Sequence, residues 1–168
     1  MASLRISRKT GKRSWKAERY FMQESLPKYE FESKKLILKL QKKMEARVES
    51  IPPFVEGVMK IVQSMGCAAG KEREVEIALL EALANAVVHG AKSDPSKEIE
   101  CCVACDESRG LLLVIRDPGE GFDPTSIPSP IVGQNLFSTH GRGIFLINQL
   151  MDEVRYEKGG TEIHMKIS

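Results

Sequence analysis

The most informative segment of this chain is Glu81-Ala-Leu-Ala-Asn85-Ala-Val-Val-His89-Gly90. Apolar residues before and within it recur at helical spacing, and glycine is common just past a helix end. The pattern therefore predicts a helix over residues 71–89 that stops at Gly90. Glu81, Asn85 and His89 stand four residues apart, so this helix presents all three on one face.

Two interpretations of this polar face are open. In the first, Glu81 and Asn85 form a solvated stripe, which is the usual state of polar residues on a surface helix. In the second, they are buried and need partners, because a carboxylate and an amide are costly to bury alone. Those partners would be a substrate proton and a metal ion, and the rest of the chain favours this second interpretation. We interpret His89 as a packing or capping residue at the helix end.

An acidic motif follows a predicted buried strand. The apolar run 111–116 leads directly into Asp117-Pro-Gly119-Glu-Gly121-Phe122. An acidic residue at a strand end, followed by two spaced glycines, places one carboxylate in a cleft with the backbone close by. We therefore expect a ligand site at Asp117.

A second glycine motif, Gly141-Arg142-Gly143, opens a predicted helix over residues 144–151. Glycines before a helix leave backbone N–H groups free to bind phosphate, and the helix dipole favours an anion there. The irregular stretch before it, residues 123–140, has the length of a lid. The apolar face that we expect this helix to pack on the core comprises Ile144, Ile147, Leu150, Met151 and Val154.

The remaining patterns complete a chain of alternating helices and strands. A strand is predicted over residues 35–40 and a hairpin over 99–116. Between them, a helix runs from residue 47 to Met65, with Ser50 as N-cap, Pro52 in the first turn and Gly66 as the stop. After a turn at Gly159-Gly160-Thr161, a last strand alternates apolar and polar residues: Ile163, Met165 and Ile167 against Glu162, His164 and Lys166. We therefore predict an α/β (α+β) two-layer sandwich, with a mixed, mostly antiparallel sheet and helices on one face.

Composition bounds the class of protein. The chain has 168 residues, 29% of them charged and 42% hydrophobic, which is typical of one globular domain. No apolar run approaches the ~18 residues that span a membrane, and the basic N-terminus lacks the apolar segment of a secretory signal. We expect a cytoplasmic protein that does not act at a membrane.

The charge is unevenly distributed along the chain. Residues 1–35 contain ten Lys or Arg against four Glu, an excess of six in a chain of net charge +2. A basic arm on an acidic body favours a flexible tail over a nucleic-acid groove, so we expect no direct contact with nucleic acid. We predict an extension over 1–34, with a short helix around 15–22 as one option and a docking arm for an acidic partner as another, and a domain over 35–168.

Four cysteines, Cys67, Cys101, Cys102 and Cys105, suit an intracellular protein. The CxxC pair 102–105 lacks the second ligand pair that a zinc site requires. We expect reduced, buried thiols, with a metal or redox role as the alternative.

Taken together, four motifs resemble the four boxes of the GHKL ATP-binding superfamily, which includes gyrase B, MutL and the histidine kinases. The first is the Glu81–Gly90 stretch, the second the motif at Asp117, the third Gly141–Ile147 and the fourth Gly160-Thr161. Within the superfamily, the short lid and the run 135–154 resemble the anti-sigma regulatory serine kinases of the RsbW type. The resemblance covers residues 35–168 and implies the Bergerat ATP-binding fold.

The resemblance implies a base pocket for ATP. Asp117 would accept a hydrogen bond from the exocyclic amine of adenine, which guanine replaces with an acceptor. Thr161 would support Asp117 or a bridging water, and the motif Gly119, Gly121 and Phe122 would let the backbone approach the nucleotide.

It also implies a phosphate end. Gly141, Arg142 and Gly143 would wrap the phosphates, with Arg142 a candidate for neutralising their charge. Asn85 would supply a neutral oxygen to Mg²⁺, and Glu81 would be the general base that takes the proton of an incoming serine hydroxyl.

Three functions remain open. The first is a serine kinase that binds a sigma factor and phosphorylates an anti-sigma-factor antagonist of the STAS-like kind, in a partner-switching pathway. The second is a module that binds nucleotide and sequesters a regulator without transferring phosphate; Glu81 favours the kinase, because binding alone needs no base. The third is a histidine-kinase catalytic domain, which the first histidine, His89, disfavours. The resemblance also implies a homodimer.

Overall fold

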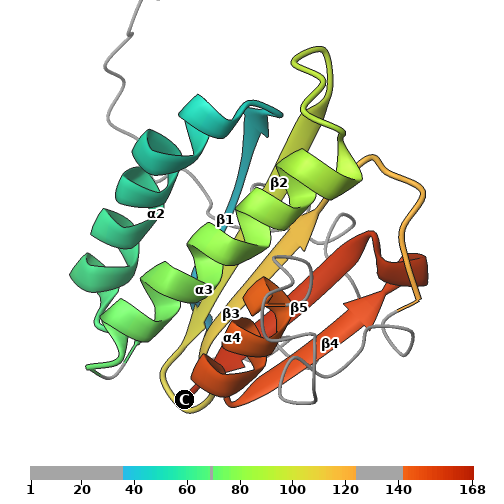
Figure 1. Cartoon of the computed structure of the whole chain (residues 1–168). Helices are drawn as coiled ribbons and strands as arrows, with labels where there is room; N and C mark the ends of the chain where they lie inside the picture. Colours follow the sequence, from blue (N-terminus) through green and yellow to red (C-terminus); the bar gives the residue numbers. More distant parts are fainter. Residues whose placement is uncertain (1–35, 69, 124–141) are drawn as a thin grey trace, which may run out of the picture.

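The computed structural model of the protein describes residues 36–68, 70–123 and 142–168. It forms a two-layer α/β sandwich in which the helices cover one face of an open sheet (Figure 1). The helices are α2 (Ile51–Met65), α3 (Glu72–Asn85) and α4 (Arg142–Leu150), with single turns η1 (Val48–Ser50), η2 (Ala86–Gly90) and η5 (Lys158–Gly160). The predicted fold class is confirmed.

The sheet has five strands among the described residues, in the order β1-β2-β3-β5-β4. Their bounds are β1 (Leu36–Glu45), β2 (Glu98–Asp106), β3 (Gly110–Arg116), β4 (Glu153–Glu157) and β5 (Glu162–Ile167). Each described strand pairing is antiparallel. The described part of the sheet is therefore fully antiparallel, whereas the prediction was a mixed, mostly antiparallel sheet. Strand β4 was not predicted, and Val154 was expected on the apolar face of the last helix. Helix α4 instead ends at Leu150, and Val154 pairs with Met165 in the sheet.

The core lies between the helices and one face of the sheet. Val55, Val58 and Val62 recur on α2 at the spacing that turns one stripe inward, and all are buried. On β3, Leu111 and Leu113 alternate toward the same layer. Helix α2 ends as predicted at Gly66, whose backbone is left-handed at φ 64°.

Helix α3 ends differently from the prediction. It stays α-helical to Asn85, and the chain then makes one π turn that ends at Gly90. Gly90 does not have the left-handed backbone that a glycine stop commonly adopts. A Cβ added to Gly90 would lie 2.2 Å from Cγ of Asp117. A glycine is therefore needed here, because the end of β3 lies so close to it.

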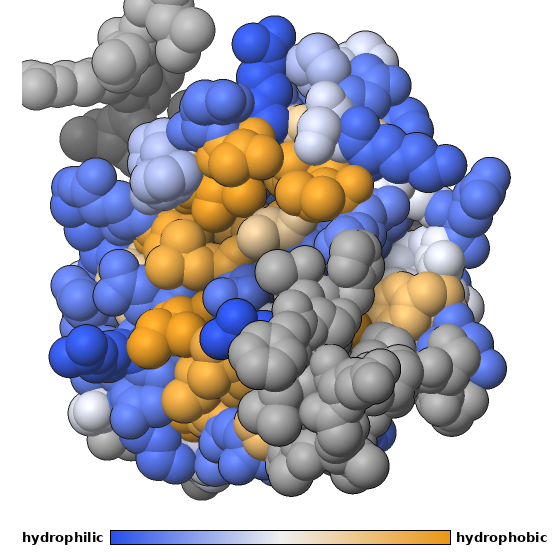
Figure 2. Space-filling view, viewed as in Figure 1, coloured by the Kyte–Doolittle hydropathy of each residue, from blue (hydrophilic) through white to orange (hydrophobic). Residues whose placement is uncertain are grey.

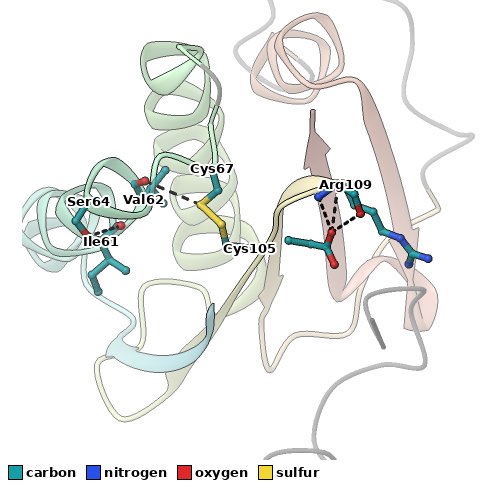
Figure 3. The surroundings of a disulfide bond; sticks show 8 residues. Ile61, Val62, Ser64, Cys67, Cys105 and Arg109 are labelled. Carbon is teal, nitrogen blue, oxygen red and sulfur yellow. Dashed lines mark hydrogen bonds between the residues drawn. A yellow bond between two sulfur atoms is a disulfide. The ribbon is translucent and has the colours of Figure 1, made fainter. Parts of the chain in front are cut away.

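A disulfide connects the two layers. Cys67, just past the end of α2, is bonded to Cys105 on β2, with the two Cα atoms 5.8 Å apart (Figure 3). The expectation that all thiols are reduced is therefore wrong for these two residues, because the fold brings them within bonding distance. Cys101 and Cys102 are free and buried.

The outer surface of the helical layer carries an apolar band along α2 and α3 (Figure 2). Met65 of α2 and Val88 of η2 are exposed large hydrophobic residues, and Phe54, Leu80 and Ala84 are half-buried hydrophobic residues of α2 and α3. In the described ranges, no helix is both long and apolar enough to cross a membrane.

Several predictions fall outside the described residues. These concern the extension over 1–34 with its short helix, the boundary at residue 35, most of the lid-length stretch 123–140, and Gly141.

Candidate functional site

Glu81 and Asn85 lie one turn apart on α3 and face the first turn of α4. A Cβ added at Gly143 would lie 2.6 Å from Oε2 of Glu81 and 3.4 Å from Nδ2 of Asn85. Gly143 is buried, and the two polar residues are half-buried. The face predicted from the sequence is therefore turned toward another element, and glycine is the residue that lets α4 approach it so closely.

Arg142 opens α4 and is exposed. The N-terminal end of this helix, whose first backbone N–H groups have no partner within the helix, therefore starts beside Glu81 and Asn85. His89 is exposed in the π turn that follows Asn85.

Asp117 follows β3 directly and is fixed by the backbone around it. The N–H of Gly119 donates to its Oδ1 at 2.8 Å, and its own N–H donates to the carbonyl oxygen of Thr161 at 3.0 Å. Burial raises the pKa of Asp117, and the bond from Gly119 opposes this in part. An acceptor held in a partly desolvated position makes a strong hydrogen bond to a donor that reaches it.

The backbone of Gly119 also lies close to the end of η2, the π turn that follows α3. A Cβ at Gly119 would be 2.5 Å from the carbonyl oxygen of Gly90. Asn85 and Gly90 bound the π turn, so the pair Glu81 and Asn85 and the pair Asp117 and Gly119 lie at its opposite ends.

Gly121 and Phe122 pack against the turn that precedes β5. The N–H of Phe122 donates to the carbonyl oxygen of Gly159 at 2.9 Å, and a Cβ at Gly121 would be 1.9 Å from that same oxygen. Thr161 lies in this contact: its Cγ2 would be 3.2 Å from that Cβ, and its hydroxyl donates to the carbonyl oxygen of Lys158 at 3.1 Å.

The structure thus brings the candidates together in two groups. Glu81, Asn85, Arg142 and Gly143 meet where α3 faces α4, and Asp117, Gly119, Gly121, Phe122 and Thr161 meet where β3 ends and β5 begins.

Within the described residues, no group of three or more His, Cys, Asp or Glu is placed to hold a metal ion. Mg²⁺ commonly takes one or two protein oxygens and completes its shell with phosphate and water, so a single amide such as Asn85 fits that ion and not a structural metal.

Sequence reasoning missed three contributors. Gly90 was interpreted as a helix stop, although its contact with Asp117 cannot be read from the chain. Lys158 opens the turn with a positive φ of 51°, a conformation that no local pattern predicts for lysine. Tyr156 contacts Phe122 edge-to-face, with ring centroids 5.4 Å apart, and lies on the strand that was not predicted.

Known proteins share this chain's pattern. Residues 44–167 match the family model described as histidine kinase-like ATPase domain. The chain is similar to the serine-protein kinase RsbW of Bacillus subtilis (strain 168), with 32% identity over 127 residues that cover 68% of this chain and 77% of that protein. It is also similar to RsbW of Bacillus licheniformis, at 31% over 68% and 77%, and of Bacillus cereus (strain G9842), at 28% over 76% and 84%. The chain therefore belongs to the histidine kinase-like ATPase domain family, the GHKL superfamily, and within it resembles the RsbW serine-protein kinases.

Proposed function

We propose that this protein is an ATP-dependent anti-sigma-factor serine kinase. It binds a sigma factor, and it phosphorylates an anti-sigma-factor antagonist of the STAS-like kind on serine, acting in the cytoplasm as a homodimer. The similarity to proteins named serine-protein kinase RsbW supports this proposal. Residues 35–168 make up the kinase domain, and 1–34 are an extension to it.

The group around Asp117 would bind the base. Its carboxylate accepts from the exocyclic amine of adenine, and guanine presents an acceptor at that position, so ATP is preferred over GTP. Thr161 holds the backbone N–H of Asp117, and Phe122 adds an apolar surface, 38% exposed, at the same edge. Gly119 and Gly121 let the nucleotide lie close to the backbone.

The group around Glu81 would act at the phosphates. Gly141, Arg142 and Gly143 contribute backbone N–H groups and one positive charge at the start of α4. Asn85 would hold Mg²⁺, which neutralises phosphate charge when bound. Glu81 removes the proton from the serine hydroxyl as the serine oxygen forms a bond to the γ-phosphorus, the bond from that phosphorus to the bridging oxygen breaks, and ADP leaves with the electron pair.

The observation that carries the kinase proposal is the position of Glu81. Its Oε2 lies against Gly143 and one helical turn from Asn85, where the terminal phosphate would meet the start of α4. A protein that only bound ATP would need Asp117 and the glycines and no carboxylate there.

Transfer from terminally labelled ATP with Mg²⁺ into the proteins of the source cell's lysate tests the proposal. Glu81→Ala and Glu81→Gln should bind ATP with unchanged affinity and lose transfer by roughly 10²–10⁴-fold, the usual contribution of a general base. A small protein labelled on serine by the wild type alone would support the kinase. Normal transfer by both variants would remove Glu81 as the base.

The alternative is a module that binds ATP and sequesters a regulator without transfer. It is favoured if the wild type binds ATP yet labels nothing when a dephosphorylated lysate is supplied.

A further inference from the structure

Glu162 is a buried carboxylate on the face of the sheet opposite the helices. It pairs across the sheet with Arg116 as β5 begins, and its side chain is 1% exposed. The next residue, Ile163, packs against the core of the helical layer, whereas Glu162 belongs to the polar alternation with His164. A carboxylate buried this deeply needs charged or hydrogen-bonding partners, since burial of an isolated charge is strongly unfavourable.

Three such partners surround it. Arg116 contacts its Oε2 through Nε, and Lys158 approaches the same oxygen through Nζ at 2.9 Å. Nε2 of His164 lies 2.6 Å from its Oε1. Burial alone would raise the pKa of Glu162, but the bonds from Lys158, His164 and Arg116 together hold that pKa below its usual range, which keeps the group a carboxylate.

Two of these three contacts, those with Arg116 and Lys158, lead to residues next to the proposed base pocket. Arg116 is bonded in sequence to Asp117, and Glu162 itself follows Thr161, whose carbonyl accepts from Asp117. Lys158 opens the turn whose next residue, Gly159, receives the N–H of Phe122.

The turn that begins at Lys158 needs a contact that stabilises its backbone conformation. Lys158, Gly159 and Gly160 have φ angles of 51°, 67° and 88°, so three successive residues have a positive φ. Lysine seldom adopts that conformation unless its surroundings enforce it. The ion pair from Lys158 to the buried carboxylate holds the side chain of this residue, beside the hydrogen bonds that its carbonyl oxygen accepts from Thr161 and that Gly159 accepts from Phe122.

We propose that Glu162 is a positioning residue for the nucleotide base, because it holds the end of β3, the start of β5 and the turn at Lys158 in one arrangement. Asp117 then presents its acceptor, and Phe122 its ring, without rearrangement when the base arrives. This inference rests on the proposed adenine-nucleotide site and adds to it the group that sets the geometry of that site from behind the sheet.

The test compares three variants by calorimetric titration with ATP and with GTP. Glu162→Gln keeps the size of the side chain and removes its charge; it should weaken ATP binding by at least tenfold and reduce the preference for ATP over GTP. Lys158→Met releases only the turn and should weaken ATP binding several-fold. Glu100→Gln is the matched control: Glu100 contacts Arg116 at 3.6 Å from the same face but makes no contact with the turn, so its ATP affinity should stay within twofold.

A purely structural role would give a different pattern. If Glu162→Gln loses affinity for ATP and GTP equally, in proportion to its unfolded fraction, and Lys158→Met binds like the wild type, the proposal is overturned. Lys158 is 61% exposed, so its replacement leaves a folded protein even if Glu162→Gln unfolds, and its ATP-to-GTP preference then decides.

The outcomes separate this inference from the proposed function. A wild type that binds ATP, beside variants with unchanged affinity and preference, overturns the role of Glu162 alone. A wild type that binds neither nucleotide overturns the adenine-nucleotide site and this inference together.

Discussion

At the scale of single residues, the half-buried carboxylate of Asp117 favours recognition of the base but lowers the stability of the folded protein. Its carboxylate is held half-buried with one hydrogen bond from Gly119, and burial raises its pKa. A raised carboxyl pKa means that the folded state favours the protonated form. The contribution of Asp117 to stability is therefore present below its unfolded pKa and is lost as the pH rises through its folded pKa.

Asp117→Asn should weaken ATP binding without lowering the stability of the protein. Loss of a bond to a charged acceptor costs roughly 1.5–3 kcal/mol, so ATP binding should weaken by at least ~10-fold in calorimetry. The Tm of the nucleotide-free variant at pH 7 should be no lower than that of the wild type, because asparagine accepts the bond from Gly119 without a buried charge. Wild-type ATP affinity in this variant would remove Asp117 from the base pocket.

Gly143 offers a test of the contact between α4 and Glu81, at the proposed phosphate end of the site. Gly143→Ala places a methyl group 2.6 Å from Oε2 of Glu81, so the carboxylate must turn away while the backbone stays. Phosphate transfer should fall by at least ~10-fold, since a misplaced base loses most of the general-base effect. Folding, followed by circular dichroism, should persist.

Gly57→Ala is the matched control for that substitution. The nearest atom to its new Cβ is the flexible Nζ of Lys42, at 3.7 Å. Alanine inside α2 should stabilise the protein by about 0.5–1 kcal/mol and leave transfer unchanged. If transfer falls equally in both variants, contact with Glu81 is not the cause.

At the scale of elements, the disulfide ties the end of α2 to β2. Its two cysteines are 38 residues apart in sequence, and the loop that they close includes all of α3, which carries Glu81 and Asn85. Closing such a loop restricts the unfolded chain and so favours the folded state.

The disulfide predicts a thiol count and a stability change. The denatured, unreduced protein should titrate two free thiols, Cys101 and Cys102, and the reduced protein four. Reduction should lower the free energy of unfolding by roughly 2–4 kcal/mol, measured by urea denaturation with and without reductant. Four thiols in the unreduced protein would contradict the pairing of Cys67 with Cys105.

At the scale of the whole molecule, the two faces of the sheet differ in how they are stabilised. The helical face is an apolar core, whereas the opposite face buries a cluster of charges around Glu162. A lowered carboxyl pKa contributes stability that is present above the unfolded value, near 4.5, and is lost as the pH falls through the folded pKa.

Acid unfolding should therefore depend on this cluster. Between pH 6 and pH 3, the Tm of the wild type should fall more steeply than that of Glu162→Gln, which has no carboxylate to protonate. At pH 7 the variant should be less stable by about 3 kcal/mol, because Arg116 and Lys158 lose the charge that compensates them. Parallel Tm curves for the two proteins would show that Glu162 does not contribute to the pH dependence.

The helices α2 and α3, the strands at Ile99 and Leu111, and the candidate site residues around Asn85 and Asp117 could be predicted from the amino-acid sequence. The helices and strands follow from the local periodicity of apolar residues. The candidate site residues follow from glycines close to an acidic residue, a pattern with few other interpretations. The alternation of apolar and polar residues in the last strand could also be predicted, since each side chain on a strand turns to the face opposite that of its neighbour.

The contacts between segments distant in the chain could not be predicted, because they depend on how the elements pack. Gly90 against Asp117, Cys67 bonded to Cys105, and Gly143 against Glu81 each join elements far apart in sequence. The short strand β4 could not be predicted, because its stability comes from pairing with β5 and not from its own five residues. The burial of Glu162 belongs to the same class: a polar residue on a strand looks exposed in the sequence, and only its packed neighbours make it a buried charge.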